Sequence, residues 1–380
     1  MEKNQFIHLI WVKVVFGIMF IENLILYCDY IRLMLTKIFD IANSMKLFDI
    51  FANGSKSKVA ILTYHRICNK NDDWSLNPLP VKSFKEHLKF LTDSYNIISL
   101  DDLVDLVEKK EPIYEKTAVL TFDDGYKDNY TNAYPLLEKY DIPATIYLTS
   151  KLIGTDELVW ADKVGYIIYH SLVDHIKIDE LSEYNLGSKF DKYQTFSLIK
   201  RKLGDLSELE KSSFIDKLAN LCEVEIPADA GCELMLSWEE VKEMDENNIV
   251  FGAHTINHPV LPELTPKEAK WEILESKRVL EKNLQKKVNH FSYPYGTFNQ
   301  GVVNIVKDLK FKSAVTLDQN LINTRKDDLY TLSRMDGFAD LNFLKLFLSG
   351  YGDYFYYFVK LKSKIIANNP RLNKMIMGSG

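Results

Sequence analysis

Short apolar runs alternate with amphipathic runs along the central part of the chain, beginning near residue 57. The apolar runs are rich in β-branched residues, as at 117–122 (TAVLTF) and 144–149 (ATIYLT). Between them, apolar residues recur at helical spacing, most clearly at 266–284, which is typical of a helix that packs on a sheet. This alternation predicts an α/β protein. We expect strands at 58–64, 97–99, 117–122, 144–149, 248–253, 288–292, 312–317 and 329–333, and helices at 84–91, 101–107, 132–140, 238–244, 266–284 and 301–309.

Residues 151–235 interrupt this alternation. The segment is charged and has a helical pattern without a clear strand period. We therefore expect an insertion that leaves the fold from one loop, as a lid or as a wall of a substrate site. The predicted organisation is an apolar helical segment at 1–56, an α/β domain at 57–340 that contains the insertion, and an aromatic and basic segment at 341–380.

The two terminal segments are unusually apolar. Residues 6–28 are interrupted by Lys13 and Glu22, so the charge-free stretch is shorter than the ~18–20 residues that a membrane-spanning helix needs. No small-residue cleavage site follows, which argues against a secretory signal. The aromatic residues of 343–365 alternate with lysines. Either segment suits a membrane surface, the domain itself or a second subunit.

These alternatives leave the location open. We expect a protein that is peripherally membrane-associated or cytoplasmic, with an extracytoplasmic location still possible, and a membrane surface or a homo-oligomer contacted through the termini. Lys and Arg number 47 and Asp and Glu number 53, giving a net charge of −6. This balance argues against nucleic acid as a partner, because phosphate binding needs a basic surface. The four cysteines form no CxxC pair; Cys222 and Cys232 could pair, but free thiols are expected.

Polar side chains follow five of the expected strands. In α/β barrels, the loops at the carboxyl ends of the strands build the active site. The groups that end these strands are His65-Arg66, Asp123-Asp124, His254, Tyr293-Pro294-Tyr295-Gly296 and Arg334.

Paired aspartates occur four times, but one pair differs from the others. The pairs at 72–73, 101–102 and 327–328 lie in polar loops or at a helix start, where solvated acids and caps are expected. Asp123 and Asp124 instead follow a buried strand and precede Gly125. Adjacent buried carboxylates repel each other unless a positive charge holds them. A metal ion that takes one carboxylate, with the other left as a base, would resolve this repulsion.

Two histidines complete a candidate metal site. His254 and His258 are four residues apart, and Pro259 disfavours a helix at His258, so we expect them in a loop after a strand. With Asp124 they form a His₂Asp set, which leaves a coordination position for water and is typical of catalytic zinc. Cobalt and nickel are compatible with the same ligands.

Three motifs give a specific family resemblance: TFDDGY at 121–126, HTINHP at 254–259 and FSYPYG at 291–296. In order and spacing they resemble the first three motifs of the polysaccharide deacetylases, the NodB homology domain of carbohydrate esterase family four. The resemblance spans about residues 57–340. It implies a distorted (β/α)₇ barrel and metal-dependent removal of acetyl groups from N-acetylated sugars in a polysaccharide or lipid-linked glycan.

The chain departs from the family pattern at two places. Ser292 stands where the family usually has an arginine beside the base aspartate, so we expect Arg334 to supply that charge. No histidine follows His290, although the common form of the family has its acid histidine late in the chain. His65, in LTYHRI, is the expected acid instead. In this feature the sequence is similar to the poly-β-1,6-N-acetylglucosamine deacetylases.

The resemblance implies a role for each remaining residue. Asp123 is the expected base, the Tyr295 backbone N–H the expected oxyanion donor, and His65 the expected acid toward the leaving amine. Two alternatives remain: an O-acetyl esterase of the same fold, and a non-catalytic pseudoenzyme that binds glycan or acts as a scaffold.

Overall fold

The computed structural model describes residues 58–68, 78–179, 182–204, 206, 208–338 and 340–349. All of them belong to one compact unit. The apolar segment at 1–56, Cys28 and the aromatic segment beyond residue 349 lie outside the described residues. Within the described ranges, no helix combines the length and the apolar character needed to cross a membrane.

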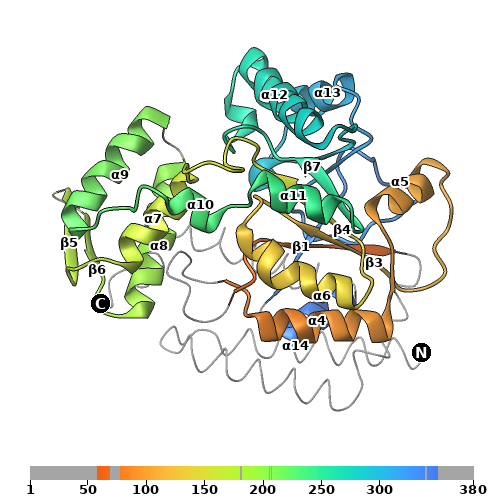
Figure 1. Ribbon diagram of the computed structural model, residues 1–380, viewed down its shortest axis with the longest axis horizontal. Coiled ribbons are helices and arrows are strands. Elements are labelled where there is room, and N and C mark those ends of the chain that lie inside the picture. Colours follow the sequence, from red (N-terminus) through yellow and green to blue (C-terminus); the bar gives the residue numbers. More distant parts are fainter. Residues whose placement is uncertain are drawn as a thin grey trace, which may run out of the picture. The chain divides into compact units, whose positions relative to one another are not determined.

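A curled parallel sheet forms the centre of this unit (Figure 1). Seven strands follow one another in the order β10-β1-β3-β4-β7-β8-β9, every pair of neighbours is parallel, and β2 pairs with β3 on the side. The arrangement confirms the expected distorted (β/α)₇ barrel. The strands are β1 (Val59–Tyr64), β2 (Asn96–Ile97), β3 (Thr117–Phe122), β4 (Ala144–Leu148), β7 (Ile249–Ala253), β8 (His290–Ser292), β9 (Ser313–Val315) and β10 (Met335–Asp336).

The central strands are buried along their whole length. Every residue of β1, β3 and β4 is buried, as expected for strands of a parallel sheet that is covered on both faces. In the register of β1 and β3, Tyr64 lies beside Phe122. The polar residues that follow these strands therefore emerge at the same edge of the sheet.

The strand expected at 329–333 is wrong in its position. Residues 328–331 form a turn in which the Thr331 N–H donates to the Asp328 carbonyl at 3.1 Å, and this turn takes up the first part of the apolar run. Leu332 then makes a single parallel bridge to Val315 of β9. The chain next pairs with β1 as β10. The segment 329–336, which we call the seam, thus connects β9 at one end of the strand order with β1 at the other.

Helices cover the sheet, with α12 and α13 on one side and α4 and α6 on the other (Figure 1). Three of the helices begin with a capping box, in which Ser99, Ser237 or Thr265 exchanges hydrogen bonds with an acidic residue three positions later. The helix expected at 132–140 begins earlier, as a π-helical turn at Asn129–Ala133 (η2). The helices are α4 (Val81–Ser94), α5 (Leu100–Glu108), α6 (Tyr134–Lys139), α11 (Trp238–Asp245), α12 (Pro266–Leu284), α13 (Gln300–Asp308) and α14 (Leu341–Leu348).

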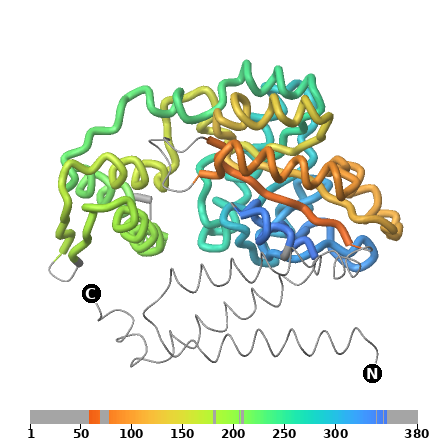
Figure 2. The backbone as a smooth tube through the Cα atoms, turned by 90° about the horizontal axis from the view of Figure 1, so that it is seen from below, coloured from red at the N-terminus to blue at the C-terminus, as the bar shows by residue number. Residues whose placement is uncertain are grey.

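The insertion is not purely helical, contrary to expectation. It contains an antiparallel pair of strands of five and four residues, which are too short to produce a clear strand period in the sequence. Its helices lie together at the left of Figure 2, and they pack on a core of their own. Cys222 and Cys232 are free thiols, as expected. The elements are α7 (Trp160–Tyr169), β5 (His175–Asp179), β6 (Ser182–Asn185), α8 (Lys189–Gly204), α9 (Glu208–Cys222) and α10 (Ala230–Leu234).

Candidate active site

The loop after β3 carries the two aspartates in a strained backbone. Asp124 has φ 76°, in the left-handed region that L-residues rarely occupy. Gly125 follows with φ 86°, which glycine adopts readily. A Cβ at Gly125 would lie 2.7 Å from the Leu148 side chain, so only glycine fits this turn. Asp123 and Asp124 are both buried. Such strain concentrates at functional sites, where the surroundings hold it in place.

Asp124, His254 and His258 come together as the sequence predicts. One ligand atom from each lies within 4.8 Å of the others. The Asp124 Oδ1 atom lies 3.5 Å from His254 Nε2 and 3.4 Å from His258 Nε2. This oxygen is buried and accepts no hydrogen bond from the described residues. A buried carboxylate oxygen without a donor is costly, and a divalent cation between the three side chains would satisfy it.

Both imidazoles are in the form that binds metal. Burial lowers the pKa of His254 and of His258 to about 4, so both rings are neutral at neutral pH. The His254 Nδ1–H donates to the Ser292 carbonyl at 2.8 Å. This hydrogen bond leaves the Nε2 lone pair directed at Asp124, which is the usual outer-shell arrangement of a metal-binding histidine. The donor set therefore fits a divalent metal ion.

The loop that presents His258 is fixed by a buried glutamate that sequence reasoning missed. Glu272, on α12, accepts hydrogen bonds from the N–H groups of Ile256 and Asn257 at 2.9 and 3.0 Å. Thr255 and His258 of the same loop have φ 67° and 58°, and the Thr255 hydroxyl accepts the His258 N–H at 3.0 Å. The signal was available, because Glu272 is a charged residue on the buried face of an amphipathic helix.

Arg334 forms a buried ion pair with Asp123. Two guanidinium nitrogens donate to the two Asp123 carboxylate oxygens at 2.7 and 2.6 Å. The remaining N–H groups reach the Thr316 carbonyl, the Thr121 hydroxyl and the Ser292 hydroxyl at 2.9–3.1 Å. All five donors of the guanidinium are thus used. Arg334 is fully buried, so it is not a surface arginine.

This pair sets the protonation state of Asp123. Burial alone would raise the pKa of Asp123, but the charge and hydrogen bonds of Arg334 outweigh it and hold the pKa well below its usual range. The Ser292 hydroxyl also donates to Asp123 at 3.3 Å. The serine therefore stands beside Asp123 at the position where the family has an arginine, and the charge comes from Arg334 on the seam.

Tyr295 and His65 border the same centre. The Tyr295 ring packs edge-on against His258 at 4.6 Å between centroids. Its backbone has φ 58° within the turn η4 (Pro294–Gly296). The His65 side chain is exposed, and its charge acts on both Asp123 and His258. The structure thus gathers all seven predicted site residues at one edge of the sheet.

The other motifs singled out in the sequence have structural roles. Asp102 belongs to the capping box of α5. Asp327 and Asp328 accept backbone N–H groups in the turn before the seam, while the pair at 72–73 lies outside the described residues. Trp160 packs beneath the Lys211 ammonium, 5.3 Å from the ring centroid, which favours packing over sugar stacking.

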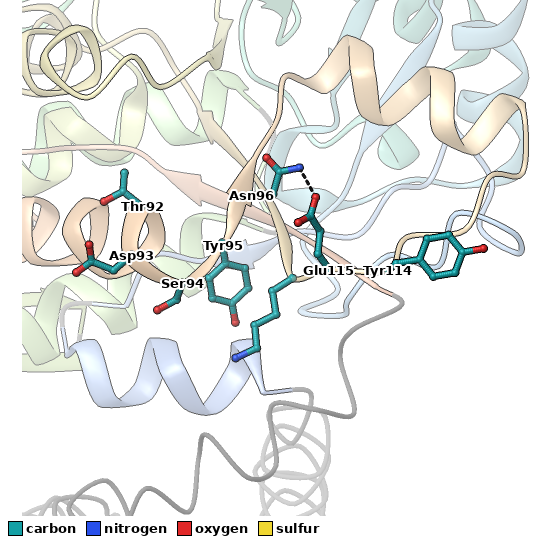
Figure 3. A pocket seen from close by; sticks show the side chains of 8 residues that line it. Thr92, Asp93, Ser94, Tyr95, Asn96, Tyr114 and Glu115 are labelled. Carbon is teal, nitrogen blue, oxygen red and sulfur yellow. Dashed lines mark hydrogen bonds between the residues drawn. The ribbon is translucent and has the colours of Figure 1, made fainter.

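A surface hollow of about 700 Å³ lies elsewhere (Figure 3). It is lined by residues 92–96 and 114–116, where β2 and β3 begin. Asn96 and Glu115 are hydrogen-bonded across it at 2.9 Å. None of the seven predicted site residues lines this hollow, and it lies at the amino ends of the strands rather than the carboxyl ends.

Comparison with known proteins defines the class to which this fold and site belong. The sequence profile named Polysaccharide deacetylase matches residues 110–314, more than half of the chain. The chain therefore belongs to the polysaccharide deacetylase family.

Two relatives and one solved structure illustrate the likeness. The chain is 25% identical to YxkH of Bacillus subtilis over 73% of this chain and 71% of that protein. It is 25% identical to the poly-β-1,6-N-acetyl-D-glucosamine N-deacetylase of Staphylococcus aureus over 59% of this chain, but spans only 56% of that relative. IcaB from Ammonifex degensii has the same fold, with a TM-score of 0.51 at 17% identity over 78% of this chain and 97% of that chain.

Proposed function

We propose that this protein is a divalent-metal-dependent N-deacetylase that hydrolyses the acetamido group of N-acetylated sugars in a glycan. The observation that carries the proposal is the juxtaposition of two arrangements. Asp123 is ionised and is held by Arg334. The adjacent Asp124 has a buried carboxylate oxygen without a hydrogen-bond donor, and the Nε2 atoms of two neutral histidines lie 3.5 and 3.4 Å from it. A metal-ligand set beside a fixed carboxylate is what hydrolysis of an amide by an activated water requires.

The residues of the site have separate roles in the proposed reaction. A metal bound by Asp124, His254 and His258 would supply Lewis acidity toward the acetyl carbonyl and toward water. Asp123 accepts a proton from the attacking water. Arg334 and Ser292 keep the Asp123 carboxylate oriented and ionised for that transfer. The buried pair is fixed before the substrate arrives, so little reorganisation is needed.

The leaving amine and the oxyanion need their own partners. His65 is exposed and its charge reaches the centre, so in its protonated form it donates to the departing sugar amine. The left-handed turn at Tyr295 directs its backbone N–H, which we assign to the oxyanion. The metal is zinc in this proposal, because zinc is typically held by three protein ligands in catalytic sites; cobalt and nickel suit the same donors.

The relatives support a substrate class. The staphylococcal relative is named for poly-β-1,6-N-acetyl-D-glucosamine, and this chain carries Tyr64-His65 at the end of its first strand. We therefore propose an N-acetylglucosamine glycan, polymeric or lipid-linked, as the substrate. An O-acetyl esterase of the same fold and a metal-free pseudoenzyme are the competing functions.

Acetate release separates these functions. Purified full-length protein with Zn²⁺ is assayed on β-1,6-linked and β-1,4-linked N-acetylglucosamine oligomers and on O-acetylated xylo-oligosaccharides, with Asp123→Asn as the inactive control. Acetate from the N-acetylated oligomers alone supports the proposal. Release from the O-acetylated substrates alone indicates the esterase, and no release from a protein that binds no metal indicates the pseudoenzyme.

The location is a second proposal, carried by the apolar segment at 1–56 and by the part of 341–380 that follows α14. We propose that they hold the protein to a membrane surface. Deletion of residues 1–45 should move the protein from a membrane pellet to the supernatant without loss of acetate release. A shift from oligomer to monomer would assign the segments to subunit contacts instead, and no change in either would reject both.

A further inference from the structure

The insertion is attached directly to the loop that carries the metal ligand Asp124. Where the insertion ends, the Leu236 N–H donates to the Gly125 carbonyl at 3.0 Å, and the Gly154 N–H donates to the Leu236 carbonyl at 2.8 Å. Met235 forms an antiparallel bridge with Tyr126. The two ends of the insertion therefore meet at the residues that immediately follow Asp124.

Tyr126 is the anchor of this attachment. Its ring is buried in a small apolar cluster, and all other members of that cluster come from the start or the end of the insertion. The cluster contains Leu152, Leu158, Val159, Ala230, Leu234 and Met235. Such a cluster ties the position of the ring to the fold of the insertion, because a packed side chain cannot move independently of its neighbours.

The polar end of Tyr126 is held as well. Its hydroxyl donates to the two carboxylate oxygens of Asp162, on the first turn of α7, at 3.1 and 3.2 Å. The Arg66 guanidinium lies over the ring at 5.0 Å and is paired with Asp128. A carboxylate from the insertion and a cation from the loop after β1 thus fix the ring from two directions.

The position of Asp162 is energetically unfavourable for a charged carboxylate. Burial raises the pKa of Asp162 to about 7, and the charge of Arg66 opposes the rise while that of Asp124 adds to it. A carboxylate that is partly destabilised by its surroundings needs a compensating contact. Among the described residues, the hydrogen bond from Tyr126 is the direct contact that its two oxygens make.

We infer that Asp162 and Tyr126 are positioning residues that hold the Asp123–Gly125 loop in its metal-binding conformation, so that the insertion is a structural part of the active site. The left-handed backbone of Asp124 is not favoured locally, and the Tyr126 anchor lies two residues beyond it. The inference rests on the proposed metal site, because what the loop positions is the ligand Asp124.

The test measures metal affinity directly. Metal-free full-length protein is titrated with Zn²⁺ against a chromophoric chelator, at a temperature well below the thermal transition of every variant. The variants are Tyr126→Phe, which keeps the ring but removes the donor, Asp162→Ala, which removes the acceptor, and Asp162→Asn, whose amide oxygen can still accept the phenol hydrogen bond. Tyr130→Phe is the matched control, since it removes an exposed hydroxyl bond to Glu243 of 2.8 Å from the same segment.

We expect Tyr126→Phe and Asp162→Ala each to weaken Zn²⁺ binding about tenfold, the usual size of an outer-shell effect. The double variant should be no weaker than either single variant, because both lose the same contact. Asp162→Asn and Tyr130→Phe should bind as the wild type does. In acetate release, kcat should fall more than KM rises.

Three results would overturn the inference. Wild-type affinity in Tyr126→Phe and Asp162→Ala would show that the loop holds itself. An equal loss in Asp162→Asn and Asp162→Ala would show that the charge of Asp162 acts, not its hydrogen bond. A wild-type protein that binds no Zn²⁺ would remove the proposed function together with the inference. Equal Zn²⁺ affinity in the wild type and the variants, the first result above, would remove the inference alone. Should Tyr126→Phe fail to fold, the two Asp162 variants decide the question.

Discussion

The carboxyl and amino ends of the strands, which form two opposite edges of the curled sheet, carry similar side chains in different surroundings. At the carboxyl edge, Asp124, His254 and His258 share one centre. At the amino edge, His290 Nδ1 bonds the Ser313 hydroxyl at 2.8 Å, and its Nε2 lies 3.4 Å from Asp101. By residue type, this second set is a Ser-His-Asp arrangement, the composition of a nucleophilic triad.

Accessibility and backbone strain separate the two sets. Ser313 and His290 are completely buried, so no substrate can reach the hydroxyl. Among the seven site residues, Asp124, His258 and Tyr295 have positive φ, whereas Ser313, His290 and Asp101 do not. The comparison teaches that residue type alone does not define a site. The two sets differ in whether a substrate can reach the polar groups and in whether the residues that carry those groups are themselves strained.

The largest expected effect comes from comparing one substitution at the carboxyl edge with one at the amino edge. Asp124→Ala should abolish stoichiometric Zn²⁺ binding and lower acetate release by roughly a thousandfold, because metal stabilisation of the transition state is worth several kcal/mol. Ser313→Ala should keep full activity. Metal content and acetate release of the two purified variants check this. Retained activity in Asp124→Ala, or its loss in a folded Ser313→Ala, would reverse the assignment of the edges.

Removing Arg334 should have the next largest effect. Arg334→Gln leaves the buried Asp123 carboxylate unpaired, which costs about 3–5 kcal/mol when a buried pair loses one member. Burial is then unopposed and raises the pKa of Asp123, so the acid limb of the pH–rate profile should move to higher pH. Arg334→Lys keeps the charge but loses the bidentate contact, so its acid limb should lie between those of the wild type and Arg334→Gln. An unshifted acid limb in a folded Arg334→Gln would argue against Asp123 as the base.

A smaller and more selective effect is expected at His65. His65→Ala should lower kcat by roughly 10²–10⁴-fold, the range for loss of a general acid, while Zn²⁺ affinity stays unchanged. Aryl acetates, whose leaving group needs no proton, should lose much less activity than N-acetylated sugars. Equal losses on both substrates would show that His65 does not protonate the leaving amine.

The smallest effect is expected at the amino edge. His290 and Lys312, whose nitrogens lie 3.4 and 3.5 Å from its carboxylate, lower the pKa of the half-exposed Asp101. A carboxyl group with a lowered folded-state pKa contributes stability that is present above its unfolded pKa and is lost as the pH falls through the folded value. Asp101→Asn should therefore cost less than about 1 kcal/mol near pH 7 and a smaller amount near pH 3. Urea denaturation at both pH values measures it, and a changed acetate release would contradict the structural role of this edge.

Local pattern explains what the sequence could predict. The strands before Asp123 and His254 are buried runs with a polar residue at the end, and parallel strands bring such ends together. The spacing of the motifs and the apolar runs before them therefore predict the His₂Asp set. The β5–β6 pair was missed because its strands are too short for a clear period.

Other contacts join residues that no local pattern connects. Arg334 was expected to serve Asp123 but was placed at the end of a strand, whereas it lies on a seam after a turn. Its partner is 211 positions away in the chain. Glu272 and Asp162 act in the same way, through contacts with loops that precede them in the sequence. Such pairings depend on the closed fold, and sequence spacing does not encode them.

The seam at 329–336 also has a consequence for the order of synthesis. It contacts both β9 and β1, and it carries the guanidinium on which the ionised state of Asp123 depends. A chain that emerges from the ribosome amino end first completes both metal-ligand motifs well before residue 334. Until the seam docks, the Asp123 carboxylate lacks its counter-charge. If the proposed function holds, we therefore expect closure of the barrel by this seam to be the step that completes the base.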